Sequence, residues 1–286
     1  MSADPVTRLL LVLALGLMLA VIAASAQLRL VRSGPGCSPW PQCYGRLAGT
    51  AETRANPARR VHRASAGGLA LILLGLLGRV WRRGPHTMLP PLLAAAALTA
   101  GLAALGIWSG GVAPVAVTLG NLLGGMALLA LLWLAWLQQG PRASGGARDR
   151  HLQRLARGGL AGATLVLVLG AVSSATFGLQ PCAATGDCSL RVLLDWQRVP
   201  VAAVHAWATV VLLPAVAAAL GAWRRPGLRR TAATVLGITA LAVLSGLVVT
   251  ATPAGLGPAL VHNLAAALLV PACLTLLWRK SAPRTG

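Results

Sequence analysis

The chain has 286 residues, of which 56% are hydrophobic and only 10% are charged, and its formal net charge is +20. This composition is too apolar for an ordinary soluble domain, and the chain is too long for a single membrane hairpin. It therefore predicts an all-α polytopic membrane protein. Eight apolar runs have about the 20 residues that a helix needs to cross the hydrocarbon of a bilayer. They lie at about residues 8–28, 64–80, 87–107, 115–137, 158–179, 199–223, 231–251 and 258–278.

The basic residues gather at the ends of these predicted helices. With eight crossings, 16 of the 25 Lys and Arg residues fall on the side that also holds both termini. Cytoplasmic segments carry an excess of Lys and Arg, so this side is expected to be the cytoplasm. The sequence thus predicts a multi-pass protein of the cell inner (plasma) membrane with both termini cytoplasmic. Topology and contact with membrane lipid then explain the positive charge, and no nucleic-acid partner is expected.

The first predicted helix leads to an outer loop rich in Pro and Gly that contains Cys37 and Cys43. Two cysteines six positions apart on the oxidising side of a membrane favour a disulfide. Free thiols or a metal pair are the alternatives, and zinc is disfavoured because the nearby sequence lacks further His or Cys ligands. Cys182 and Cys188 repeat the spacing in a later outer loop, which strengthens the disulfide interpretation.

His62 enters the second predicted helix among several arginines. Arg59, Arg60 and Arg63 lie beside it in the sequence. Basic residues on the outer side run against the general charge bias, so they indicate either an anionic ligand or contact with lipid headgroups. In the fourth predicted helix, Gly120, Asn121, Gly124 and Gly125 allow either close helix packing or room for a flat ligand.

The second part of the chain repeats the plan of the first. Val204-His205 follows a loop with two cysteines, as Val61-His62 does. We therefore expect two pseudo-symmetric four-helix bundles. The predicted divisions are an N-terminal half at 1–140, a cytoplasmic linker at 141–157 and a C-terminal half at 158–286. His86 and His151, in charged cytoplasmic segments, are expected to be solvated, and Cys273 is expected to be a small buried residue.

His205 and His262 lie in the sixth and eighth predicted helices, each about one to two turns below the outer face. An ionisable residue inside a membrane helix is a functional candidate, because burying it unpaired is costly. Two histidines at one depth can ligate a heme iron from both sides. The alternative is that each is hydrogen-bonded to a neighbouring backbone group. A proton relay is disfavoured, because none of the five acidic residues lies in the middle of a predicted helix.

The order and spacing of these features resemble the heme A synthase family over nearly the whole chain. The motifs that carry the resemblance are Cys-Ser-Pro-Trp-Pro-Gln-Cys-Tyr-Gly at 37–45, Val61-His62-Arg63, Val117-Thr118-Leu119 and Val261-His262-Asn263. The resemblance implies an oxidoreductase that converts a methyl group of heme O to the formyl group of heme A for cytochrome oxidase biogenesis. Heme O synthase and assembly proteins of the terminal oxidase are the protein partners that it implies.

The resemblance also assigns residues. It implies that His205 and His262 hold a resident heme b in the C-terminal half. The substrate heme O would lie beside His62, under the Cys37–Cys43 loop. His62 is thus a candidate both for the catalytic site and for iron ligation.

Two positions depart from the pattern of that family. It has a glutamate three residues before the first histidine, where this chain has Arg59, and a second histidine in the fourth helix, where this chain has Gly120 or Asn121. Glu52 is a poor substitute, because Pro57 separates it from the helix. The alternative function is therefore a non-catalytic heme-binding membrane protein, either a heme carrier or an oxidase assembly factor. A quinol-linked cytochrome that only passes electrons is a third.

Overall fold

A computed structural model describes residues 4–33, 57–108, 115–139, 150–176, 190–251 and 256–278. Within these ranges, the side chains at 30–33, 115, 173–176, 190–206, 226, 250–251 and 256 are not described. The regular structure of the described residues is helical. The first four helices are α1 (Pro5–Ser33), α4 (Pro57–Arg83), α5 (Leu89–Trp108) and α6 (Val115–Leu137). The next four are α7 (Arg150–Thr176), α9 (Leu190–Trp223), α10 (Arg229–Ala251) and α11 (Leu256–Trp278).

The predicted fold class is confirmed, because each of the eight predicted apolar runs overlaps one of these helices. In the described part of the chain, seven helices are long and apolar enough to cross a membrane, and α9 contributes the shorter apolar segment Trp207–Trp223. Large apolar side chains such as Leu71, Leu74, Leu213 and Leu244 are exposed on the helix surfaces. This exposure fits a protein whose surroundings are lipid, since lipid chains solvate apolar side chains.

Several helices extend beyond the apolar runs that predicted them. The helix α4 begins at Pro57, α7 begins at Arg150, within the segment expected to be a linker, and α9 begins at Leu190. An apolar window marks only the residues that match the hydrocarbon, whereas Arg, Leu and Ala continue a helix into the polar interface. The extension places His62 and Arg59 inside α4, and Pro57 occupies the first helical position, where proline is favoured.

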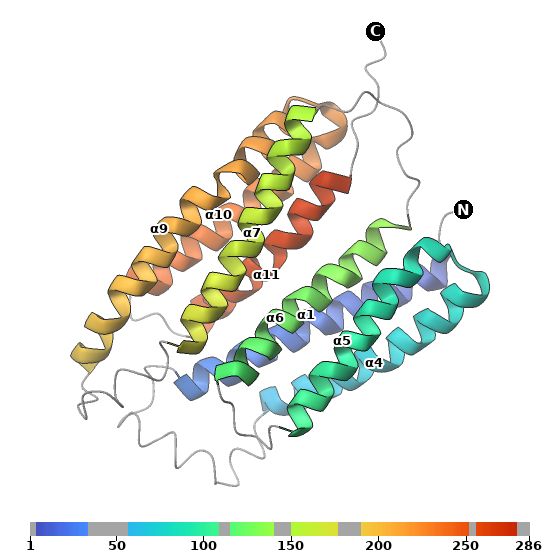
Figure 1. Ribbon diagram of the computed structural model, residues 1–286, viewed down its shortest axis with the longest axis horizontal. Helices are drawn as coiled ribbons and strands as arrows, with labels where there is room; N and C mark the ends of the chain where they lie inside the picture. Colours follow the sequence, from blue (N-terminus) through green and yellow to red (C-terminus); the bar gives the residue numbers. More distant parts are fainter. Residues whose placement is uncertain are drawn as a thin grey trace.

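Each half of the chain forms a ring of four helices (Figure 1). In the first ring, α1 packs on α4, α4 on α5, α5 on α6, and α6 returns to α1. In the second ring, α7, α9, α10 and α11 pack in the same order, and α11 returns to α7. The two rings are therefore pseudo-symmetric four-helix bundles. Helices at opposite corners of a ring, such as α9 and α11, face each other across its centre.

Three helix pairs join the two bundles: α1 with α11, α6 with α7, and α6 with α11. Two side-chain hydrogen bonds cross this junction. Arg29 Nη2 donates to Asn263 Oδ1 over 2.6 Å, and Trp133 Nε1 donates to Thr275 Oγ1 over 2.7 Å. The first bond joins the last part of α1 to the first part of α11, and we call this end of the bundles the distal end. The halves are thus connected by polar as well as apolar contacts.

The two bundles have different cores. Large side chains such as Leu11, Met18, Leu73 and Leu132 fill the first, whereas the second contains many buried alanines. In the second bundle, Gly159 and Gly162 of α7 lie directly against α9. A Cβ atom added at Gly159 would meet the backbone of Ala215, and one added at Gly162 would meet the carbonyl oxygen of Val211. Small residues of this kind bring membrane helices into backbone contact.

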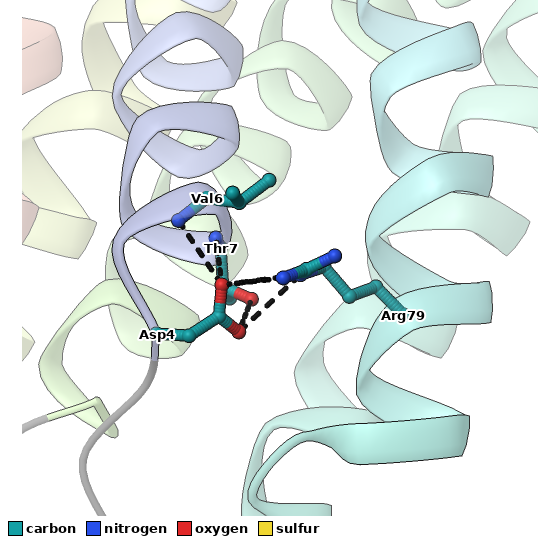
Figure 2. Close-up of polar contacts among 4 residues, drawn as sticks. All are labelled: Asp4, Val6, Thr7 and Arg79. Carbon is teal, nitrogen blue, oxygen red and sulfur yellow. Dashed lines mark hydrogen bonds and ion pairs between the residues drawn. The ribbon is translucent and has the colours of Figure 1, made fainter.

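At the opposite end of the first bundle, Asp4 caps α1 and pairs with Arg79 of α4 (Figure 2). Asp4 Oδ1 accepts hydrogen bonds from the backbone N–H groups of Val6 and Thr7 at 3.0 and 3.1 Å. Arg79 Nη2 lies 2.7 Å from the same oxygen. The Arg79 guanidinium and the Thr7 hydroxyl hold the pKa of the Asp4 carboxyl well below its usual range. One carboxylate thereby fixes the start of α1 against the end of α4.

Candidate functional site

His62 lies near the start of α4, on the side of the helix that packs against the bundle. Ala58, Ser65, Leu69 and Leu73, which recur at helical spacing on either side of it, are buried, and His62 itself is half-buried. Its Nδ1 atom lies 3.0 Å from Ser25 Oγ of α1. The helix therefore presents His62 to α1 at the distal end, rather than to the lipid.

Arg59 precedes His62 by three residues, so the two side chains lie on the same side of α4. Arg59 is half-buried, whereas Arg60 and Arg63 are exposed. The family that the sequence resembles has a glutamate at the position of Arg59, whereas this chain has a partly buried guanidinium there. The three cations make this corner of the distal end electropositive.

His262 lies near the start of α11 and is half-buried. Its Nδ1 atom lies 3.0 Å from the carbonyl oxygen of Ala242 and 3.4 Å from Ser245 Oγ, both on α10. A carbonyl oxygen only accepts hydrogen bonds, so Nδ1 carries the proton and the lone pair of the neutral ring is on Nε2. Metal-ligating histidines commonly have this arrangement, with one ring nitrogen on a backbone carbonyl and the other on the metal.

His205 lies in α9, but its side chain falls outside the described residues. The backbone still fixes its position along the helix. His205 is 18 residues before the end of α9 and His262 is 16 residues before the end of α11. At 1.5 Å per residue, their distances along the helix from these two helix ends differ by about 3 Å, and the helices stand at opposite corners of one ring. That His205 and His262 face one another stays a prediction.

The glycines of α6 pack against neighbouring helices. A Cβ atom added at Gly120 would lie 3.0 Å from Leu105 of α5, and one added at Gly124 would lie 2.6 Å from Leu102 of the same helix. Gly120 therefore faces α5, and close packing accounts for it. A Cβ atom added at Gly125 would lie 3.6 Å from Met18 of α1.

Asn121 lies on a different face of α6. It is one helical turn before Gly125 and shares its face with the buried residues Leu128 and Leu132. That face is directed toward α1 and the inside of the bundle, although Asn121 itself is exposed. Of the two positions that the sequence left open for a second histidine, 121 is the one on the inward face.

Arg29 is a site residue that the sequence analysis did not single out. It lies one turn after Ser25 on α1 and donates through Nη2 to Asn263, the residue after His262. Asn263 Nδ2 donates to the carbonyl oxygen of Ala259, so its Oδ1 is directed at Arg29. The Nε atom of Arg29 is buried and has no hydrogen-bond partner in the part of the chain that the structure describes. The sequence shows an arginine at the end of the first apolar run, but it does not identify Asn263 as the hydrogen-bond partner of that arginine.

The remaining predictions fall on exposed or undescribed positions. His86 and His151 are exposed and Cys273 is buried, as expected. Cys37, Cys43, Cys182 and Cys188 lie outside the described residues, so the two disulfides stay predictions. Among the side chains that the structure describes, no three His, Cys, Asp or Glu residues gather as a metal site. A heme iron with two axial histidines does not need such a group.

Two comparisons with known proteins identify the family of the chain. The chain is 30% identical over 194 residues to a protein named heme A synthase from Shewanella oneidensis. The matched part is 59% of this chain and 57% of that relative's length. Residues 8–274 match the model of the COX15-CtaA family, described as cytochrome oxidase assembly protein, which spans nearly all of the helical structure. The chain therefore belongs to the COX15-CtaA family of cytochrome oxidase assembly proteins.

Proposed function

We propose that this chain is an oxidoreductase of the heme A synthase type, which oxidises the methyl group of heme O to the formyl group of heme A for cytochrome oxidase biogenesis. Membership of a cytochrome oxidase assembly family and the similarity to a protein named heme A synthase support this proposal. In it, His205 and His262 hold a heme b in the second bundle, and His62 lies on the side of the substrate heme. The protein acts in the plasma membrane with both termini in the cytoplasm.

The orientation of His262 is the observation that carries the proposal. Its Nδ1 lies at hydrogen-bond distance from the Ala242 carbonyl, so Nδ1 carries the proton and Nε2 carries the lone pair that ligation of an iron requires. Heme supplies one-electron redox chemistry when bound, and the chain's part is to fix the ring, exclude water and set the charge around it.

Residues of the first bundle would position the substrate. Ser25 fixes the imidazole of His62, and the cations Arg59, Arg60 and Arg63 provide charge complementary to heme carboxylates. The inward face of α6 carries Asn121 rather than a histidine. Among the described side chains at this end of the bundle, His62 is the histidine that would ligate a heme, and it would leave the other face of the iron accessible for reaction.

The second candidate function, a heme carrier or assembly factor without turnover, is favoured by one observation. Arg59 places a permanent positive charge beside His62, where a carboxylate would accept a proton or stabilise positive charge. Such a charge suits the binding of an anionic ligand better than it suits an oxidation that builds up positive charge. The two candidates share the heme sites and differ in chemistry.

Heme extraction from cells separates the two functions. The full chain is produced in cells that contain heme O synthase but no other heme A synthase, and the extracted hemes are identified by mass. The enzyme is expected to yield heme A only when heme O is supplied, and His62→Ala is expected to abolish it. The exposed His86→Ala serves as the matched control. Protein that copurifies with heme but yields no heme A would instead support the carrier.

A further inference from the structure

Arg29 is a half-buried cation at the junction of the two bundles. Through Nη2 it reaches from α1 of the first bundle to Asn263 on α11 of the second, over 2.6 Å. Its Nε–H is buried and has no hydrogen-bond partner among the described residues. A guanidinium carries five N–H donors in a planar fork that matches the two oxygens of a carboxylate. Burying such a charge without an anion is costly, so the site calls for an acidic ligand.

The described side chains provide no carboxylate for it. Asp4 is the acidic side chain among them, and it lies at the other end of α1, where it pairs with Arg79. The other four acidic residues, Glu52, Asp149, Asp187 and Asp195, lie where side chains are not described. An anion therefore comes either from one of these or from a bound molecule.

The surroundings of Arg29 favour a bound heme. Asn263 directly follows His262, and Ser25, one turn before Arg29, contacts His62. Arg29 thus stands between the candidate iron ligands of the two bundles, at the end of the molecule where both lie. A heme carries its carboxylates together on one edge of the ring, within reach of groups around its axial ligands.

We propose that Arg29 binds a carboxylate of the heme that His262 ligates, so that a helix of the first bundle completes the heme site of the second. This inference rests on the proposed function. The guanidinium holds the heme edge through Nε–H, while Asn263 fixes the orientation of the fork. Arg29 is then a positioning residue for the heme and also a charge that favours its reduced state.

Heme titration with two ligands tests the site. Full-length protein, produced under heme limitation and purified in detergent, is titrated with protoheme and with its dimethyl ester, and the Soret band is followed. The ester keeps the ring and iron but has no carboxylate. We expect unmodified protein to bind the acid about 10-fold or more tightly than the ester, because only the acid can accept a charge-assisted hydrogen bond from Arg29. Arg29→Gln should weaken binding of the acid alone, and Arg29→Lys should restore part of the difference.

Arg8→Gln is the matched control, because Arg8 is an exposed arginine at the other end of the same helix. It should leave the acid-to-ester ratio unchanged. An Arg29→Gln variant that weakens both ligands equally would overturn the site and assign Arg29 to an internal carboxylate. An unmodified protein that binds neither ligand would overturn the proposed heme-binding function itself, and this site with it.

Two backgrounds identify which heme supplies the carboxylate. The acid-to-ester difference should survive His62→Ala and disappear in His262→Ala, if the heme of the second bundle is the ligand. The reverse pattern would support the same carboxylate site and assign it to the heme beside His62. The midpoint potential of the bound heme gives a separate measurement, which should fall in Arg29→Gln and stay unchanged in Arg8→Gln.

Discussion

Ser25 on α1 and His62 on α4 lie 3.0 Å apart, measured from Oγ to Nδ1. Ser245 on α10 and His262 on α11 stand in the same relation at 3.4 Å. In each bundle, a serine of a neighbouring helix thus lies beside Nδ1 of a candidate iron-ligating histidine. In metal-ligating histidines such a contact to one ring nitrogen commonly orients the ring, and the other nitrogen binds the metal.

Ser25→Ala should weaken the first-bundle site. It removes the hydroxyl that orients His62, and loss of such an outer partner commonly costs about 10- to 100-fold in metal affinity. Affinity for heme O, measured by Soret titration of the purified protein, is therefore expected to fall about 10-fold. Ser25→Thr keeps the hydroxyl and should retain binding. Equal affinity in Ser25→Ala and the unmodified protein would show that this contact does not orient the ring.

His205→Ala and His262→Ala should each abolish the low-spin spectrum of a six-coordinate b-type heme. One remaining imidazole leaves the iron open on one face, which changes its coordination and spin state. Absorption spectra of the reduced and oxidised proteins measure this change. His86→Ala and His151→Ala replace exposed histidines and should leave the spectrum intact. A low-spin spectrum that persists in both ligand variants would disprove the assignment.

Asn121→His combined with Arg59→Glu should raise the yield of heme A above that of the unmodified chain. The pair supplies a second axial ligand on the inward face of α6 and removes a positive charge beside His62. Gly120→His is the control, because its side chain would meet Leu105 of α5 and not the bundle interior. Heme A per mole of protein, determined by mass, decides the matter. No difference between the two histidine positions would count against the inward placement of residue 121.

The four cysteines predicted to lie in outer loops are expected to resist alkylation until they are reduced. A Cys37–Cys43 and a Cys182–Cys188 disulfide would each close a short loop, and a disulfide needs Cα atoms within about 7 Å. Mass spectrometry after labelling, with and without prior reduction, measures both pairs. Cys273, which is buried in α11, is an internal reference that reacts only on unfolding. Labelling of either pair in unreduced protein would rule out that disulfide.

Gly162→Ala should destabilise the second bundle, since its Cβ would meet the backbone of Val211 on α9. Overpacking of this kind costs about 1–3 kcal/mol in free energy of unfolding. Thermal unfolding in detergent should therefore show a lower Tm. Gly170→Ala on the same helix meets nothing within 4 Å and should be neutral or slightly stabilising. Similar Tm values for both variants would contradict the close contact of α7 and α9.

The sequence was sufficient to predict the membrane helices, because a run of apolar residues long enough to cross the bilayer has few other structures available to it. It was less informative at helix ends, where polar residues continue a helix without any change of hydropathy, as at Arg150. It also left Gly120 and Asn121 as equal choices. Adjacent residues differ by about 100° around a helix, and only the packing of α6 on α5 and α1 separates their directions.

The contact of Arg29 could not be predicted from the sequence, for a different reason. Its partner Asn263 is 234 residues away, so their contact depends on how the two bundles associate. The local periodicity of apolar residues carries no information about how the two bundles associate. The histidines were easier to identify from the sequence, because an ionisable side chain is rare within an apolar membrane helix.

The helix pairs at the junction of the bundles have one further consequence. Because α6 and α11 are the fourth helices of their bundles, their contact joins two equivalent helices. The contact of α1 with α11 likewise matches that of α7 with α6. Two copies of a single four-helix unit would meet through this same surface as a closed isologous homodimer. Gene duplication and fusion would then preserve an interface that already existed. In a homodimer, a pair such as Arg29 and Asn263 would occur twice, whereas in the fused chain it can occur on one side only.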